Sequence, residues 1–78
     1  MPRFFFDHRD GNDFIRDDDG LELASVENAR EEATSGLAGI VRDTLPCAIG
    51  REIAVEVSDE NQRPLFRVRV WSQLELLS

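Results

Sequence analysis

The chain opens with an aromatic run that predicts a β-strand with apolar side chains on both faces. Three consecutive phenylalanines stand near the start, and the run ends at the turn-forming Asp10-Gly11-Asn12. Because side chains alternate along a strand, Phe4 and Phe6 lie on one face and Phe5 on the other. Both faces of this strand, predicted over about residues 2–9, therefore need apolar cover.

A short second strand is predicted at about residues 13–16, where the chain returns from the hairpin turn. It ends at Asp17-Asp18-Asp19-Gly20, which is a second turn signal. The following Leu21-Glu22-Leu23 is either a short extended segment or the approach to a helix, and we predict the extended form.

Apolar residues then recur at intervals of three and four over about eighteen residues, which predicts one amphipathic helix. Ser25 suits the N-cap, and Pro46 ends the helix because its ring blocks continuation. Gly36 and Gly39 each cost a helix about 1 kcal/mol relative to alanine, so we expect a packing reason for them. The apolar stripe consists of Val26, Ala29, Ala33, Leu37, Ile40 and Val41.

Two further strands are predicted after the helix. Residues 51–58 alternate in polarity, which places Ile53 and the two valines inward and Ala54 outward. The last strand, from about residue 64 to 72, carries apolar side chains on one face and a mixed set on the other. The mixed face holds Leu65, Arg67, Arg69 and Trp71.

These elements predict a single small α+β domain over residues 1–78, with a four-stranded antiparallel sheet and one amphipathic helix in the order β-β-α-β-β. One helix covers only one face of such a sheet. The other face needs a cover, which the C-terminal leucines, a second copy of the chain or a different protein partner would supply. We expect a homodimer, formed by sheet-face packing or by pairing of an edge strand. The expected interface consists of Phe5, Leu65, Arg67, Arg69, Trp71, Leu74, Leu76 and Leu77.

The length of 78 residues also favours association, because so short a chain buries a thin core. Its single cysteine, Cys47, excludes an internal disulfide. No apolar stretch approaches the roughly 20 residues that span a bilayer, and no basic-then-hydrophobic leader stands at the start. We therefore expect a soluble cytoplasmic protein with no membrane partner.

The net charge of −7 is uneven, since residues 1–35 carry ten acids against four arginines. An anionic surface repels phosphate backbones, which disfavours nucleic-acid binding. Arg67 and Arg69 beside Trp71 form a face that would stack bases, so a nucleic-acid or nucleotide-associated regulator is the first alternative. A salt-bridged dimer surface opposite Glu52 and Glu56 is the favoured interpretation.

A second alternative is a minimal enzyme centred on His8 and Asp10. His8 is the only histidine, and Asp7 points to the opposite strand face. No serine or cysteine is placed to act as a nucleophile beside this pair, and Cys47 has no histidine nearby in sequence. We therefore predict no catalytic residue, and a half-buried or edge histidine near a turn.

The acidic turn over residues 17–20 is the one candidate for a metal, because hard cations select carboxylate oxygens. It lacks the ligand spacing of an EF-hand, and aspartates in such turns accept hydrogen bonds from their own backbone without a metal. We predict no metal and no cofactor.

Several segments together resemble a family of short bacterial proteins of unknown function, whose members typically begin M-P-R followed by Tyr or Phe. The resemblance covers residues 1 to about 71, and it implies a small α+β domain without an established activity, cofactor or catalytic residue. The segments are Met1-Pro2-Arg3-Phe4-Phe5-Phe6, Arg9-Asp10-Gly11, Asp19-Gly20, Val26-Glu27-Asn28-Ala29-Arg30 and Ile53-Ala54-Val55-Glu56-Val57-Ser58-Asp59-Glu60. We expect a non-enzymatic, self-associating interaction or accessory module.

Overall fold

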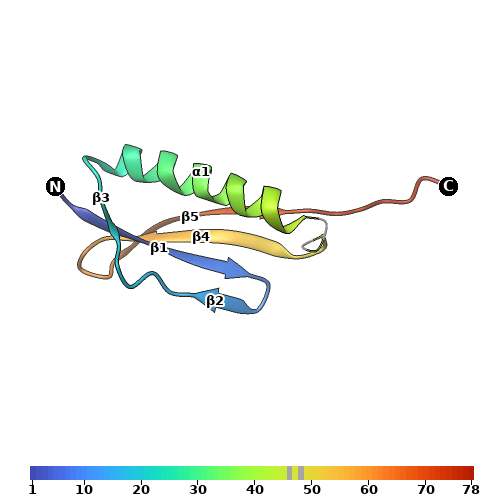
Figure 1. Cartoon of the computed structure of the whole chain (residues 1–78), viewed down its shortest axis with the longest axis horizontal. Helices are drawn as coiled ribbons and strands as arrows, with labels where there is room; N and C mark the ends of the chain where they lie inside the picture. Colours follow the sequence, from blue (N-terminus) through green and yellow to red (C-terminus); the bar gives the residue numbers. More distant parts are fainter. Residues whose placement is uncertain (46, 48) are drawn as a thin grey trace.

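The computed structural model describes residues 1–45, 47 and 49–78. One helix lies across one face of an antiparallel sheet, so the molecule has two layers (Figure 1). The predicted α+β class with a single helix is confirmed. In chain order the elements are β1 (Arg3–Asp10), β2 (Asp13–Ile15), β3 (Leu21–Glu22), α1 (Val26–Thr44), β4 (Glu52–Ser58) and β5 (Pro64–Trp71).

The sheet has five strands, so the predicted count of four is wrong. Four of them follow the order β2-β1-β4-β5, and β3 pairs antiparallel with the start of β1. β2 and β3 are two pieces of one interrupted strand, because the five residues 16–20 between them lie opposite only residues 5–7 of β1. The extended form predicted around Leu21 is confirmed as β3.

The turn between β1 and β2 holds two residues, Gly11 and Asn12, between the paired Asp10 and Asp13. Gly11 has a φ of +60°. A glycine with positive φ at the first of two loop positions is typical of a type II′ turn, whose twist matches that of the flanking strands. This turn sets the register of the whole hairpin.

The helix begins and ends close to the predicted residues. The Oγ of Ser25 accepts a hydrogen bond from the backbone N–H of Asn28 at 3.2 Å, which is an N-cap contact. The last helical residue is Thr44, and Leu45 is extended with φ −74° and ψ 143°. That conformation suits a residue before a proline, although Pro46 itself lies outside the described residues.

The core lies between α1 and the sheet, where Ala29 and Ala33 are at most 1% exposed. Ala54 points away from α1, as the alternation predicts, and it is nevertheless 0% exposed. It stands between Arg9 and Arg69 in the register, and long arginine stems cover a small neighbour. The buried cluster consists of Phe4, Ala29, Ala33, Leu37, Ile53, Val55 and Val57.

The expected packing reason for the two helical glycines is also wrong. A Cβ added at Gly36 would meet no described atom within 4 Å, and one at Gly39 would meet only the Arg42 guanidinium at 3.8 Å. Both positions therefore lie beside the contact with the sheet. They weaken the helix without serving its packing.

The chain after Trp71 runs away from the body of the molecule as an extended segment (Figure 1). Leu74, Leu76 and Leu77 are 63, 87 and 95% exposed. These side chains therefore lie away from the sheet, and the cover that they would have given to its second face is not made within the chain. No helix in the described ranges is long and apolar enough to cross a membrane.

We predict that Gly36→Ala raises the free energy of unfolding by about 1 kcal/mol, because alanine is the better helix former and the site has room. Gly20→Ala is the opposite control. Gly20 has a φ of +72°, and its added Cβ would lie 2.9 Å from Phe5 Cε1, so this variant should be destabilised. Urea unfolding followed by circular dichroism measures both, and equal effects of the two changes would contradict the prediction.

Candidate interaction face

The face of the sheet opposite α1 carries no second layer within the described residues (Figure 1). We call it the open face. The register places alternate residues of β1, β4 and β5 on it, together with one residue of β2. Among its side chains are Phe5, Asp7, Arg9, Phe14, Glu52, Ala54, Glu56, Leu65, Arg67, Arg69 and Trp71.

Ion pairs along the open face join β4 to the strands on either side. Glu56 Oε2 lies 2.8 Å from Arg67 Nη2 and 3.3 Å from Arg9 Nε. Glu52 Oε2 lies 3.8 Å from Arg69 Nη1. Glu52 and Glu56 were expected to pair with Arg67 and Arg69 of a second copy across a dimer. They pair instead with the arginines of their own chain. Such half-exposed pairs contribute about 1 kcal/mol or less each, so their main effect is to neutralise the arginines.

Arg9 has a second contact on this face. Its guanidinium carbon lies 4.8 Å from the ring centroid of Phe14, within the range of a cation–π interaction. The guanidinium therefore bridges the ring on β2 and the carboxylate of Glu56 on β4. This bridge ties the short β2 to the rest of the sheet.

Apolar side chains remain exposed around the charged centre of the open face. Trp71 is 61% exposed, Phe14 is 46% exposed and Leu65 is 37% exposed. Phe5 is half-buried. Several exposed apolar side chains on one face of a small protein are typical of a contact site, and Phe5, Leu65 and Trp71 are among the predicted interface residues.

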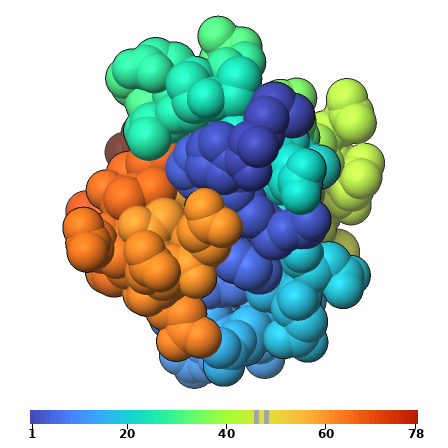
Figure 2. All heavy atoms as spheres, turned by 90° about the vertical axis from the view of Figure 1, so that its left-hand side faces the viewer, coloured from blue at the N-terminus to red at the C-terminus, as the bar shows by residue number. Residues whose placement is uncertain are grey.

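One end of the open face is hollowed by a cavity of about 730 Å³. Figure 2 shows this end of the molecule, where the orange β4–β5 loop and the cyan acidic turn lie on either side of the dark blue start of β1. The cavity wall combines rings with carboxylates. Among its residues are Phe5, Asp7, Phe14, Asp17, Glu56 and Leu65.

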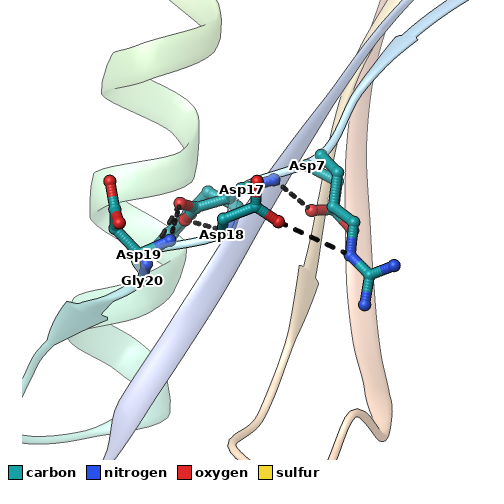
Figure 3. A network of polar contacts seen from close by, with 7 residues as sticks. Asp7, Asp17, Asp18, Asp19 and Gly20 are labelled. Carbon is teal, nitrogen blue, oxygen red and sulfur yellow. Dashed lines mark hydrogen bonds and ion pairs between the residues drawn. The ribbon is translucent and has the colours of Figure 1, made fainter.

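The acidic turn is held to β1 by the carboxylate of Asp17 (Figure 3). Its Oδ2 accepts a hydrogen bond from the N–H of Phe6 at 3.0 Å, and its Oδ1 accepts from the N–H groups of Asp19 and Gly20 at 3.1 and 3.0 Å. In return, the N–H of Asp17 donates to Asp7 Oδ1 at 2.9 Å. The side chain thus takes the place of the main-chain partner that β1 lacks between β2 and β3.

These contacts set the acidity of Asp17. Partial burial alone would raise the pKa of its carboxyl, but the hydrogen bonds from the amides of Gly20, Phe6 and Asp19, with the charge of His8, lower that pKa below its ordinary value. The ionised form is therefore the one that holds the turn.

The same turn is tied to the beginning of β1. Arg3 Nη1 donates to the carbonyl oxygen of Asp19 at 2.8 Å, and Arg3 Nη2 lies 3.0 Å from Glu22 Oε1. Gly20 has a positive φ and passes so close to Arg3 and Phe5 that no side chain fits. Sequence reasoning identified the turn but missed this contact, because only the pairing of β1 with β3 brings Arg3 to it.

The residues of the enzyme alternative lie on the other side of the sheet. His8 is exposed on the α1 side, in register with Ile15 and Val55. Asp10 Oδ1 lies 3.2 Å from Arg51 Nε. Within the described residues, no hydrogen bond or ion pair joins His8 to Asp10. Cys47 is exposed.

The acidic turn was the one metal candidate. Three backbone amides already occupy the oxygens of Asp17. Among the described residues, no group of three or more His, Cys, Asp or Glu side chains is arranged to hold a metal ion.

The fold and the open face define a small two-layer α+β domain with one sheet face uncovered. Residues 3–71 match the family described as "Domain of unknown function (DUF6894)". This match spans most of the chain, so the protein belongs to that family, and the resemblance seen in the sequence is confirmed. No curated protein and no solved structure matches the chain.

We predict that Asp17→Ala lowers the free energy of unfolding by about 1–2 kcal/mol at pH 7, because three amides lose a charged acceptor. The folded-state pKa of Asp17 is lowered, so its contribution is complete above the unfolded value of about 4 and is lost as the pH falls through the folded value. The gap between wild type and variant should therefore shrink below about pH 4. Urea unfolding across pH 2.5–7, as an approximate range around the ordinary aspartate pKa, measures it.

Asp18→Ala is the matched control, because it removes the same charge from a neighbouring side chain that is 86% exposed. It should change stability little at any pH. Equal losses for the two variants would contradict the role given to Asp17.

Proposed function

We propose that this protein is a non-enzymatic interaction module that associates with a second copy of itself through the open face and the adjoining edge of β5, and that it works in the cytoplasm. The observation that carries the proposal is the exposure of Trp71, at 61%, and of Leu65, at 37%, on a sheet face without a second layer in the described chain. Its single cysteine, which has no internal partner, suits a reducing compartment.

The thin core supports association. Of the eight buried hydrophobic residues in the described chain, three are alanines. A domain of this size gains little from so small a core, and oligomerisation is one of the usual compensations. In a two-fold dimer the same surface of each copy forms the contact, so a single exposed patch on this chain is enough for association.

The arrangement of charges gives less support to the nucleic-acid alternative. Arg67 and Arg69 each face a carboxylate of β4, and the chain carries a net charge of −7. Phosphate binding relies on cations that are free to neutralise the backbone. The enzyme alternative is weaker because His8 and Asp10 lack a shared contact in the described structure.

We expect the full chain to form a dimer at micromolar concentrations and Trp71→Asp to weaken it at least about tenfold, since burying a new charge in a contact is costly. Light scattering over a wide concentration range gives the dissociation constant. Ala38→Asp adds the same charge on the exposed side of α1 and should leave the dimer intact. A wild type that stays monomeric, or equal effects of the two variants, would refute self-association through this surface.

We also expect the wild-type chain to show no salt-dependent binding to single-stranded oligonucleotides in fluorescence anisotropy, and His8→Ala to leave the dimer constant within about twofold. Steep loss of oligonucleotide affinity with salt, abolished by Arg69→Ala, would favour the regulator instead. Arg30→Ala, on the helix, is the control for a general charge effect.

A further inference from the structure

The outer edge of β5 has unpaired backbone groups over its whole length. On its inner side β5 pairs with β4, and the N–H of Gly50 extends this ladder by donating to the carbonyl oxygen of Ser72 at 2.9 Å. In an antiparallel ladder, successive residues direct their N–H and C=O groups to opposite edges. The groups of Leu65, Arg67, Arg69 and Trp71 therefore point outward, where no other described strand lies beside them.

The opposite edge of the sheet is different. There β2 and β3 are only three and two residues long, and the acidic turn separates them. Short, bulged edge strands resist pairing with another chain, whereas a straight eight-residue strand invites it. The edge of β5 is thus the one that is open to strand addition.

The segment that follows β5 has the pattern of a strand without a partner. Residues 73–78 continue beyond the sheet (Figure 1), and they alternate from Leu74 to Leu76 on one side with Glu75 between them on the other. The leucines are 63 and 87% exposed. An extended segment with this alternation matches an edge strand of the same alternation.

We propose that two copies of the chain pair residues 64–78 as antiparallel strands about a two-fold axis at Trp71, so that residues 73–78 of each copy add to the β5 edge of the other. This inference rests on the proposed self-association and narrows its surface to β5, with Trp71, and the segment after it, so the β2 side of the open face lies outside the contact. The two sheets become one continuous sheet, and both helices lie on the same side of it because residues of like parity face one another.

The register about Trp71 sets no like charges against each other. Three of its pairs are apolar on both sides, and Arg67 faces Glu75 of the second copy. Opposite charges and apolar pairs placed directly across an antiparallel pair are stabilising. The remaining facing pairs are Leu65 with Leu77, Phe66 with Leu76, Val68 with Leu74, Arg69 with Gln73 and Val70 with Ser72.

The two nearest registers lose part of this match. An axis at Ser72 keeps two apolar pairs and sets Arg69 against Glu75, but it sets Arg67 against Leu77 and Trp71 against Gln73. An axis at Val70 keeps one apolar pair, Phe66 with Leu74, and sets Leu65 against Glu75.

Larger shifts are less favourable still. An axis at Arg69 would set that arginine against itself, and an axis at Val68 would set Arg67 against Arg69 of the second copy. Like charges directly opposite one another are destabilising. The axis at Trp71 is therefore favoured.

Pairing in this register also gives the leucines an apolar surface. Leu74 and Leu76 fall on the α1 side, next to Phe66 and Val68 of the second copy. Those two side chains are only half-buried and pack against the rim of the core. The added leucines extend that rim, which is a contact that packing of two open faces against each other would not provide.

The first test compares the dimer dissociation constants of two variants of the full chain, measured by light scattering. The double variant Leu74→Ser, Leu76→Ser should weaken the dimer at least about tenfold, since two buried leucines are lost. Phe14→Asp, which lies on the open face but on β2, should leave the dimer intact. Circular dichroism confirms that each variant is folded.

The results separate the two claims, and a serine variant that keeps the wild-type dimer overturns strand pairing whatever Phe14→Asp does. Loss of the dimer in the serine variant alone supports strand pairing. Loss in Phe14→Asp alone overturns strand pairing while self-association through the open face stands. A wild type that is monomeric throughout overturns both.

The second test reads the register by disulfide formation in a Cys47→Ser background. Arg69→Cys and Gln73→Cys face each other across copies, so an oxidised mixture of the two should yield a cross-linked heterodimer. Each variant alone places its two cysteines about 13 Å apart, four residues along the strand, which is too far for a disulfide. Cross-linking of Gln73→Cys with itself as fast as in the mixture would overturn the register.

Discussion

The packing of α1 against β4 is the contact on which the rest of the structure depends. Ala29 and Ala33 are small enough to bring the helix close to the sheet, where Ile53, Val55 and Val57 are at most 3% exposed. A single helix can do this on one face only. Every other feature follows from that one-sided burial, because the second face of the same strands must be stabilised without a second apolar layer.

On the open face, ion pairs between neighbouring strands stand where a second apolar core would otherwise lie. Glu56 binds arginines from both neighbouring strands, and the arginine stems cover Ala54, which is 0% exposed. Half-exposed ion pairs add little stability. They make the centre of the face polar, while apolar side chains remain exposed around it. That surface, with Trp71 at 61% exposure, is why association rather than catalysis is the function we propose.

The two edges of the sheet differ in whether the edge strand is continuous. At the first edge, Asp17 interrupts the strand and satisfies the N–H of Phe6 with its own carboxylate, so a main-chain ladder is replaced by a side chain. At the second edge, β5 runs straight for eight residues and continues into exposed leucines. An interrupted edge discourages pairing with another chain and a straight edge permits it. The β5 edge is therefore the one at which we expect a second copy to pair.

The sequence by itself determined the α+β class, the helix that begins after Ser25 and ends close to residue 45, and the alternation that buries Ile53, Val55 and Val57. These depend on periodicity and turn chemistry, which are local. It also placed Arg67, Arg69 and Trp71 on one face. It did not reveal that Leu21–Glu22 is a fifth strand, that Gly36 faces open space, or that Glu52 and Glu56 bind the arginines of their own chain. Only the tertiary structure decided these, because the pairing of β3 and the ion pairs depend on the register between strands, and the surroundings of Gly36 depend on how α1 lies on the sheet.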